Sequence, residues 1–165
     1  MSLLAYTDGG CRGNPGPGAW AFLLIDRETG AALERADGEA ATTNNRMELM
    51  GAIATLRALK QPNSVVEIRS DSSYVVQAAS EWIPGWKARG WRRKEGPLKN
   101  LELLQELDRL GALHRVTWRR VKGHAGERLN EHVDRLVNAA MDRLARGESA
   151  HQERRGSWPV AEIPA

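Results

Sequence analysis

Residues 3–10, Leu3-Leu4-Ala5-Tyr6-Thr7-Asp8-Gly9-Gly10, join a short apolar run to a glycine-rich turn region. The apolar run predicts a first strand over residues 3–7. The turn region, residues 9–18, contains five glycines and two prolines. Two more strands are predicted at residues 20–25 and 31–35, with a short hairpin turn between them. The beginning of the chain therefore predicts three consecutive strands that pair antiparallel.

Beyond residue 44 the spacing of apolar side chains changes from that of strands to that of helices. A stripe with helical spacing predicts a helix over residues 45–59, and it is followed by a fourth strand at residues 65–68. Further helices are predicted at residues 72–79, 81–87 and 100–110, a fifth strand at 115–121, and a long last helix that ends near Arg146. Strands that alternate with helices pair parallel. The predicted fold class is therefore α/β, a five-stranded mixed sheet with three antiparallel strands followed by two parallel strands, flanked by helices.

Length and composition favour one folded domain over residues 1–146, followed by a flexible tail. The chain has 165 residues, 41% hydrophobic and 27% charged, which is normal for a globular protein. Residues 147–165 lose all periodicity and are rich in Gly, Pro and charge. No apolar stretch is long enough to cross a membrane, no signal peptide is recognised, and the single Cys11 cannot form an internal disulfide. We expect a cytoplasmic monomer.

Four acidic residues stand at special points of this pattern. Asp8 follows the first strand, Asp71 follows the fourth, Glu48 lies near the start of the first helix, and Asp134 lies in the last helix. Ligands of such sheets often bind where strands end and connections diverge. Converging carboxylates would form an oxygen-rich site for hard divalent cations. That arrangement indicates the chemistry of phosphodiester hydrolysis.

Each acidic residue taken alone also has a structural explanation. Asp8 before two glycines fits a turn residue, and Asp71 before two serines fits a helix N-cap. Glu48 in a first helical turn would complement the helix dipole, and Asp134 would be a solvated charge. His124, between glycines, is either an exposed loop histidine or a group that moves protons near neutral pH.

The segment from Trp82 to Lys99 is strongly basic. It holds six basic residues and one acidic residue, so it carries +5 in a chain whose net charge is only +3. Three tryptophans are interleaved with these cations. They either pack a helical connection or form a handle for a nucleic-acid substrate, with cations on phosphates and aromatic rings against sugars.

Short motifs in a fixed order extend from about residue 3 to residue 145. They are Tyr6-Thr7-Asp8-Gly9-Gly10-Cys11, Asn14-Pro15-Gly16, Thr42-Thr43-Asn44-Asn45-Arg46-Met47-Glu48-Leu49, Ser70-Asp71-Ser72, Trp82-Ile83, Trp86-Lys87, Arg89-Gly90-Trp91, Val121-Lys122-Gly123-His124-Ala125-Gly126, and Asn130-Glu131 with Asp134. This ordered set resembles the ribonuclease H family in its type 1 bacterial form.

The resemblance implies a ribonuclease H-like fold and a catalytic domain over residues 1–146. It implies that Asp8, Glu48, Asp71 and Asp134 are catalytic carboxylates that bind two Mg²⁺ ions, with Mn²⁺ as a possible substitute. The implied reaction is endonucleolytic hydrolysis of the RNA strand of an RNA–DNA hybrid, which leaves 5′-phosphate and 3′-hydroxyl ends. His124 would aid proton transfer or product release.

The resemblance also implies a set of substrate-binding residues. Minor-groove contacts, which distinguish a hybrid from a plain duplex, fall on Cys11, Asn14, Asn44 and Asn45. A pocket for a DNA phosphate falls on Thr43 and Asn100. The handle that grips the DNA strand falls on Lys87, Arg89, Trp91 and Lys94, while Trp82 is assigned to packing.

Two positions depart from the family pattern, and two other functions compete with hybrid hydrolysis. Ser73 stands where the family often has Gln, and Glu127 stands where it often has a second histidine. One rival is a non-catalytic module that binds hybrids, but a pure binder gains nothing from clustered negative charge beside phosphate. The other is a two-metal nuclease or strand-transfer enzyme that acts on DNA, which the motif at residues 42–49 and the basic segment disfavour.

Overall fold

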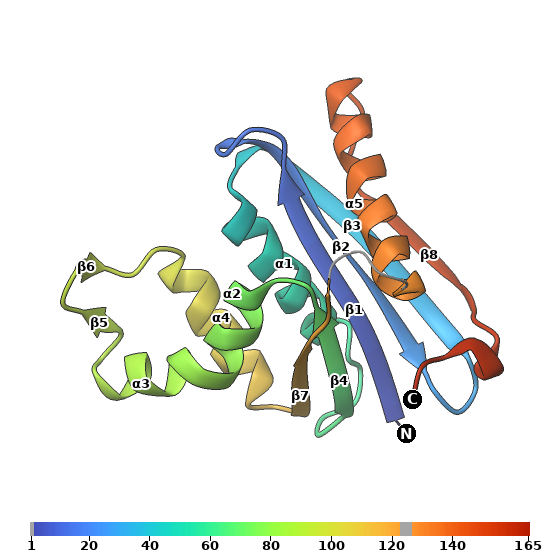
Figure 1. Cartoon of the computed structure of the whole chain (residues 1–165), viewed down its shortest axis with the longest axis horizontal. Helices are drawn as coiled ribbons and strands as arrows, with labels where there is room; N and C mark the ends of the chain where they lie inside the picture. The colour runs from blue at the N-terminus through green and yellow to red at the C-terminus, as the bar shows by residue number, and fades with distance from the viewer. Residues whose placement is uncertain (1, 123–126) are drawn as a thin grey trace.

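The computed structural model describes residues 2–122 and 127–165, which form one mixed sheet with helices on both faces (Figure 1). The sheet has six strands in the order β7-β4-β1-β2-β3-β8. The strands are β1 (Ser2–Cys11), β2 (Gly16–Asp26), β3 (Ala31–Thr42), β4 (Val65–Ser70), β7 (Arg115–Arg120) and β8 (Gln152–Ser157).

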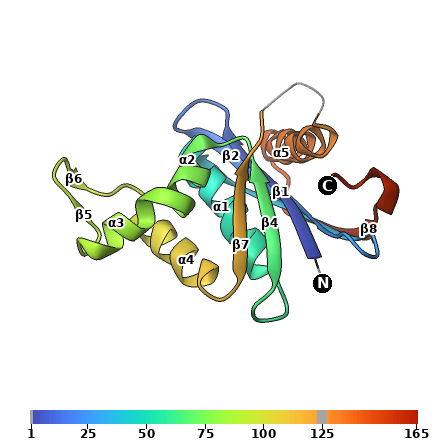
Figure 2. The same ribbon diagram turned by 60° about the horizontal axis from the view of Figure 1, so that its bottom comes forward.

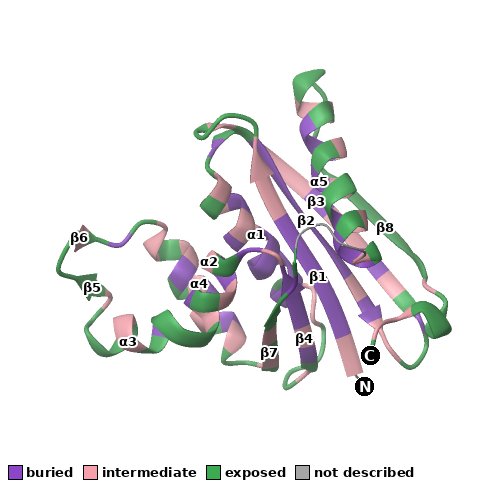
Figure 3. Cartoon of the chain, in the orientation of Figure 1, coloured by how far each residue is buried: buried purple, intermediate pink, exposed green. Residues whose placement is uncertain are grey.

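The pairing within the sheet confirms the predicted α/β class. β1, β2 and β3 pair antiparallel, whereas β4 pairs parallel with β1 and with β7. The antiparallel strands are much longer than their apolar runs, because the ladder continues into the glycine-rich turn region as far as Cys11. Buried residues fill the middle of the sheet (Figure 3). The side chains of β1 alternate between two cores, with Tyr6 on one side and Ala5 on the other.

Each face of the sheet is covered by its own helices (Figure 2). α5 (Arg128–Ala145) packs against β1, β2 and β3 on one face, and α1 (Asn44–Arg57) and α4 (Leu101–Gly111) cover the other. The remaining elements connect β4 to α4 and include a two-stranded ribbon. They are α2 (Ser73–Gln77), the π-helix η1 (Ala78–Trp82), α3 (Ile83–Ala88), β5 (Arg92–Arg93) and β6 (Gly96–Pro97). Within the described residues, no helix has the length and apolarity needed to cross a membrane.

The prediction of a flexible tail is wrong, and with it the count of five strands. Residues 152–157 form β8, which pairs antiparallel with residues 31–36 of β3. Arg35 holds Glu153 of the new strand through two hydrogen bonds of 2.8 and 2.6 Å. All six residues of β8 are exposed, because this edge strand has no core to face on either side. Without a buried face it has no apolar alternation, and the sequence pattern gave no signal of a strand.

The chain beyond β8 completes the core beneath α5. The main-chain N–H of Trp158 donates a hydrogen bond to Gly30 O at 2.7 Å. The indole ring of Trp158 lies 5.3 Å from the His132 ring. Trp158 and Ile163 both pack against the core cluster that α5 forms with the sheet. The last turn is the 3-10 helix η2 (Val160–Glu162). Residues 147–165 are therefore an ordered part of the fold.

Candidate active site

Asp8 and Asp71 adjoin because β1 and β4 run parallel and their pairing ends just before both residues. β1 itself continues to Cys11, so Asp8 lies within the strand and not after it as predicted. Thr7 of β1 pairs with Ser70 of β4, so the next residue of each strand is one of the two aspartates. Asp8 is only 8% exposed, and its Oδ1 accepts a hydrogen bond from Gly9 N at 2.9 Å. Asp71 is half-buried. The strand pairing alone therefore brings together two residues that are 63 positions apart.

Two glycines bring Glu48 to the same end of the sheet, because they let α1 lie directly against β1. A Cβ on Gly9 would lie less than 3.0 Å from the backbone of Met47 and Glu48. A Cβ on Gly51 would similarly lie less than 3.0 Å from Thr7 Oγ1. Such separations do not occur between real atoms, so any side chain at either position would push the helix away from the strand.

Ser72 links Glu48 to the start of α2. Its Oγ accepts from Val75 N at 3.2 Å, which makes Ser72 the N-cap of the helix. The same hydroxyl donates a short hydrogen bond to Glu48 Oε2. Ser72, and not Asp71, therefore caps the helix, which leaves the Asp71 carboxylate free to face Asp8. Ser73 is the exposed first residue of α2.

α5 contributes Asp134 and a residue that the sequence reasoning missed, Asn130. The two lie one helical turn apart and share a face. Asn130 is 3% exposed and hydrogen-bonds Asp71, while its Oδ1 is buried without a partner among the described residues. A buried amide one turn before a candidate ligand is a signal that could have identified it. Asp134 is exposed, and its main-chain oxygen accepts from Asn138 Nδ2 at 3.0 Å.

The carboxylates destabilise one another's charged forms. Burial, together with the negative charges of Asp71 and Asp134, raises the pKa of Asp8 to about 8. Burial is also the main cause that raises the pKa values of Glu48 and Asp71. Ser72 opposes the shift at Glu48, and Asn130 opposes it at Asp71. An anionic cluster of this kind is unfavourable until cations neutralise it.

The donor set fits hard divalent cations. All four side chains offer carboxylate oxygens, which Mg²⁺ and Mn²⁺ prefer. Within residues 2–122 and 127–165, no three Asp, Glu, His or Cys side chains already surround a common metal position. The carboxylates of Asp8, Asp71 and Asp134 nevertheless lie close enough to interact electrostatically.

The predicted position of His124 lies outside the described residues. Glu127, the departure three residues later, occupies the N-cap position of α5. Its Oε2 accepts a hydrogen bond from the Tyr6 hydroxyl at 3.1 Å. The extra negative charge of Glu127 is therefore engaged by a buried tyrosine of β1.

Five of the predicted substrate residues gather where the β1–β2 turn meets the start of α1. Asn14 Oδ1 accepts from Asn44 N at 3.3 Å, and Thr43 is the N-cap of α1. Cys11 is half-buried, with its thiol 2.7 Å from Gly13 O. Asn14, Thr43 and Asn45 are exposed at this junction, whereas Cys11 and Asn44 are half-buried.

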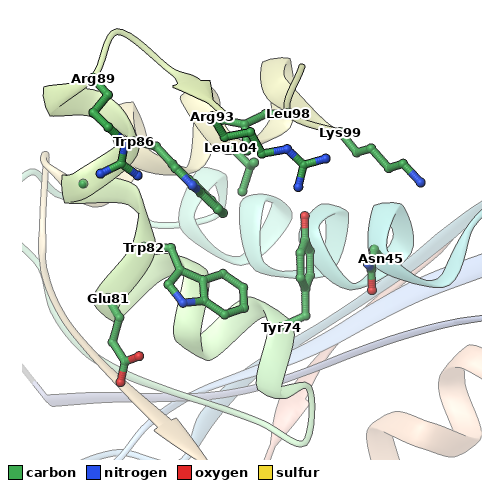
Figure 4. Close-up of a pocket in the computed structure, with 11 residues that line it drawn as sticks. Asn45, Tyr74, Glu81, Trp82, Trp86, Arg89, Arg93, Leu98, Lys99 and Leu104 are labelled. Atoms are coloured by element: carbon green, nitrogen blue, oxygen red, sulfur yellow. The ribbon is translucent and has the colours of Figure 1, made fainter. Parts of the chain in front are cut away.

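The basic segment forms a projection beside this junction, with a cavity of about 640 Å³ between them (Figure 4). Tyr74, Trp82 and Trp86 line it with aromatic surface. Its other lining residues include Asn45, Gly85, Arg89, Arg93 and Lys99. Tyr74 also hydrogen-bonds Asn100, which has a left-handed backbone with φ of 60°. The cavity therefore joins the two groups of predicted substrate residues.

The structure distributes the tryptophans differently from the sequence prediction. Trp82, assigned to packing, is 36% exposed and faces the cavity. Trp91, assigned to the handle, is half-buried and packs against the core on the α1 side of the sheet. Lys87 and Lys94 are both exposed, and Lys87 Nζ lies 3.0 Å from Asp108 Oδ2.

Comparison with known proteins identifies the family. The model of the RNase H family matches residues 1–142. The chain belongs to the ribonuclease H family. It is 54% identical over 139 residues to ribonuclease H of Rhodopirellula baltica, covering 82% of this chain and 87% of that one. It is 50% identical over 142 residues to ribonuclease H of Caulobacter sp., covering 84% and 89% of the two chains.

Solved ribonuclease H structures share the fold. LC9-RNase H1, a type 1 RNase H with the type 2 active-site motif, matches with a TM-score of 0.80 and 33% identity, over 98% of this chain and 79% of the other. LC11-RNase H1 in complex with an RNA/DNA hybrid matches with a TM-score of 0.65 and 25% identity, over 87% and 99% of the two chains. As a ribonuclease H, this protein is an endonuclease that cleaves RNA in RNA–DNA hybrids, and its family is typically metal-dependent.

Proposed function

We propose that Asp8, Glu48, Asp71 and Asp134 are the catalytic carboxylates and together hold two Mg²⁺ ions, for which Mn²⁺ can substitute. The observation that supports the proposal is their convergence where the β1–β4 pairing ends, with Asp8 and Asp71 following paired residues, Asp134 interacting with both, and Glu48 held by Ser72. When bound, such a pair of ions activates a water molecule and stabilises the leaving oxygen of an in-line displacement at phosphorus. The products are 5′-phosphate and 3′-hydroxyl ends.

The residues around the carboxylates hold them in place. Ser72 donates to Glu48 and Asn130 donates to Asp71, so each hydrogen bond fixes the orientation of one oxygen ligand. Asp8 is held by its strand and by the Gly9 N–H. On the sequence resemblance, His124 aids proton transfer or product release.

We assign substrate recognition to two surfaces on either side of the cavity. Cys11, Asn14, Asn44 and Asn45 read the minor groove, where 2′-hydroxyls distinguish RNA from DNA, and Thr43 with Asn100 holds a DNA phosphate. The projecting basic segment, with Lys87, Arg89, Trp91 and Lys94, grips the DNA strand through its phosphates. Trp82 and Trp86 join this set, because both line the cavity.

Cleavage assays test the proposal directly. Labelled RNA–DNA hybrid, duplex DNA, duplex RNA and single-stranded RNA are each incubated with and without Mg²⁺. Cleavage of the hybrid alone, dependent on the cation and abolished by Asp71→Asn, is the expected result. Binding without cleavage would support the non-catalytic module, and cleavage of duplex DNA would support the DNA nuclease.

The cellular setting follows from the sequence. We propose that the enzyme acts as a cytoplasmic monomer, because neither a heptad pattern nor a membrane-spanning stretch interrupts the globular composition. Light scattering of the purified protein tests the monomer, and a mass twice that of the chain would contradict it.

A further inference from the structure

β7 forms one edge of the sheet, next to β4 (Figure 2), and it ends opposite the residue that precedes Asp71. Arg120, its last residue, pairs with Ser70 of β4, and Val121 N donates to Ser70 O at 2.9 Å. Neighbouring strands lie about 4.8 Å apart, so the Arg120 backbone is one strand spacing from the residue that precedes Asp71. The end of β7 is therefore part of the surface that the scissile strand approaches.

The segment from residue 115 to residue 122 carries only positive charge. It contains Arg115, Arg119, Arg120 and Lys122 with no acidic residue, and all four are exposed. Arg119 lies 3.9 Å from Glu67. No described carboxylate lies within ion-pair distance of Arg115, Arg120 or Lys122. Three cations of this segment are thus available for a ligand.

These cations are separate from the basic segment at residues 82–99. Two of them, Arg120 and Lys122, lie at the carboxylate end of β7, whereas Arg115 lies at the opposite end, about 17 Å away at 3.3 Å per residue. Charges on an edge strand also prevent pairing with other sheets, and that role would be served equally at both ends. A contact with substrate would depend on Arg120 and Lys122 alone.

The carboxylate cluster creates a need for such a contact. Four acidic groups repel the phosphates that flank the bond to be cleaved. Two bound metal ions would offset this repulsion for the scissile phosphate more than for the phosphates on either side. The strand presented to the carboxylates is the one that is hydrolysed, the RNA. Cations at this end of β7, whose last residue pairs with the residue before Asp71, are placed to hold an RNA phosphate next to the scissile one.

We propose that Arg120 and Lys122 form a second phosphate contact, which binds the RNA strand next to the cleavage site. This inference rests on the proposed function of the carboxylates. It adds a contact to the RNA strand, whereas the basic segment at residues 82–99 is assigned to the DNA strand. The ligand is the phosphodiester backbone and not the bases, so the contact is independent of RNA sequence.

The test compares two variants of the same strand. Arg120→Gln combined with Lys122→Gln removes the proposed contact, and Arg115→Gln removes an equally exposed, equally unpaired cation from the other end. Steady-state cleavage of a labelled hybrid in Mg²⁺ is measured for both over a range of KCl concentrations. Thermal denaturation of each variant establishes that the fold is unchanged.

The double variant is expected to raise KM about tenfold, because the loss of each contact should raise KM about twofold to fivefold. We expect kcat to stay largely unchanged. The slope of log KM against log salt should fall by roughly one to two, since each phosphate contact contributes about 0.9. Arg115→Gln should match the wild type in both quantities.

Two results would overturn the inference. One is a double variant whose KM and salt slope equal those of the wild type, and the other is an equal effect of Arg115→Gln, which would indicate general electrostatics. Failure of the proposed function is distinguishable, because the wild-type protein would then not cleave the hybrid in Mg²⁺ at all.

Discussion

Asp8→Asn separates the catalytic role of this carboxylate from its effect on folding. Asn keeps the size and the hydrogen-bonding capacity of the side chain but cannot ionise. In the presence of Mg²⁺ we expect hydrolysis of the hybrid to be abolished. In the absence of divalent cations we expect the folded state to become more stable at neutral pH, because the wild-type chain must take up a proton at Asp8 when it folds, and Asn removes that requirement.

The magnitude follows from the raised pKa. An acid whose pKa is higher in the folded state than in the unfolded state destabilises the folded protein as pH rises. The loss of stability begins at the unfolded-state pKa and is complete above the folded-state pKa. For Asp8 that interval extends from 3.8 to about 8. Each pH unit within it costs about 1.4 kcal/mol, so at pH 7 the penalty is at most about 4 kcal/mol. Relaxation of the neighbouring carboxylates reduces it, and a gain of about 1–3 kcal/mol is expected for the variant.

Urea denaturation in EDTA at pH 7 and at pH 4 measures the effect. The gain should be present at pH 7 and nearly absent at pH 4, where the unfolded chain also holds much of the Asp8 proton and folding requires little proton uptake. Asp26→Asn, at the opposite end of the sheet, is the matched control and should show no such pH dependence. A variant less stable than the wild type at pH 7, or a gain of equal size at both pH values, would refute the electrostatic reasoning.

Three further predictions address the handle, the helix contact and the C-terminal segment. Replacing Lys87, Arg89 and Lys94 together by Ala should raise KM and flatten its salt dependence in steady-state assays, while kcat at saturating hybrid stays largely intact. Gly9→Ala should destabilise the fold by about 1–3 kcal/mol in urea denaturation and lower kcat, because α1 must move away from β1 and carry Glu48 with it. Trp158→Ala should destabilise the fold by about 1–3 kcal/mol, measured by thermal denaturation, because the indole packs on the core beneath α5.

Each of these predictions has a result that would contradict it. Loss of kcat with unchanged KM would remove the handle from substrate binding. For the helix contact, Gly111→Ala is the control, since a Cβ there meets no atom within 4 Å; equal effects of the two substitutions would exclude a steric cause. An unchanged melting temperature in Trp158→Ala would show that residues 147–165 contribute little to stability.

The sequence by itself determined the elements whose side chains have one buried face. The apolar stripe of α1 and the runs of β2 and β4 predict helix and strand, because burial on one side imposes a period on the chain. The sequence also determined which four acidic residues occupy special points of this pattern. Each lies near the predicted end of a strand, near the start of a helix, or on the rim of an apolar stripe. The α/β class followed from these local patterns.

Only the tertiary structure decided which residues hydrogen-bond those carboxylates and which tryptophan faces the cavity beside them. Ser72 and Asn130 act across elements distant in sequence, and no local spacing reports which carboxylate each will meet. Trp82 and Trp91 occur in similar basic surroundings, yet the packing of the connection exposes one and half-buries the other. β8 is the clearest case, because an edge strand held by backbone hydrogen bonds and by Arg35 needs no apolar period. Burial of one face imposes a periodic spacing of apolar residues on the sequence. Interactions between exposed or distant groups impose no such spacing, and they depend on the tertiary structure.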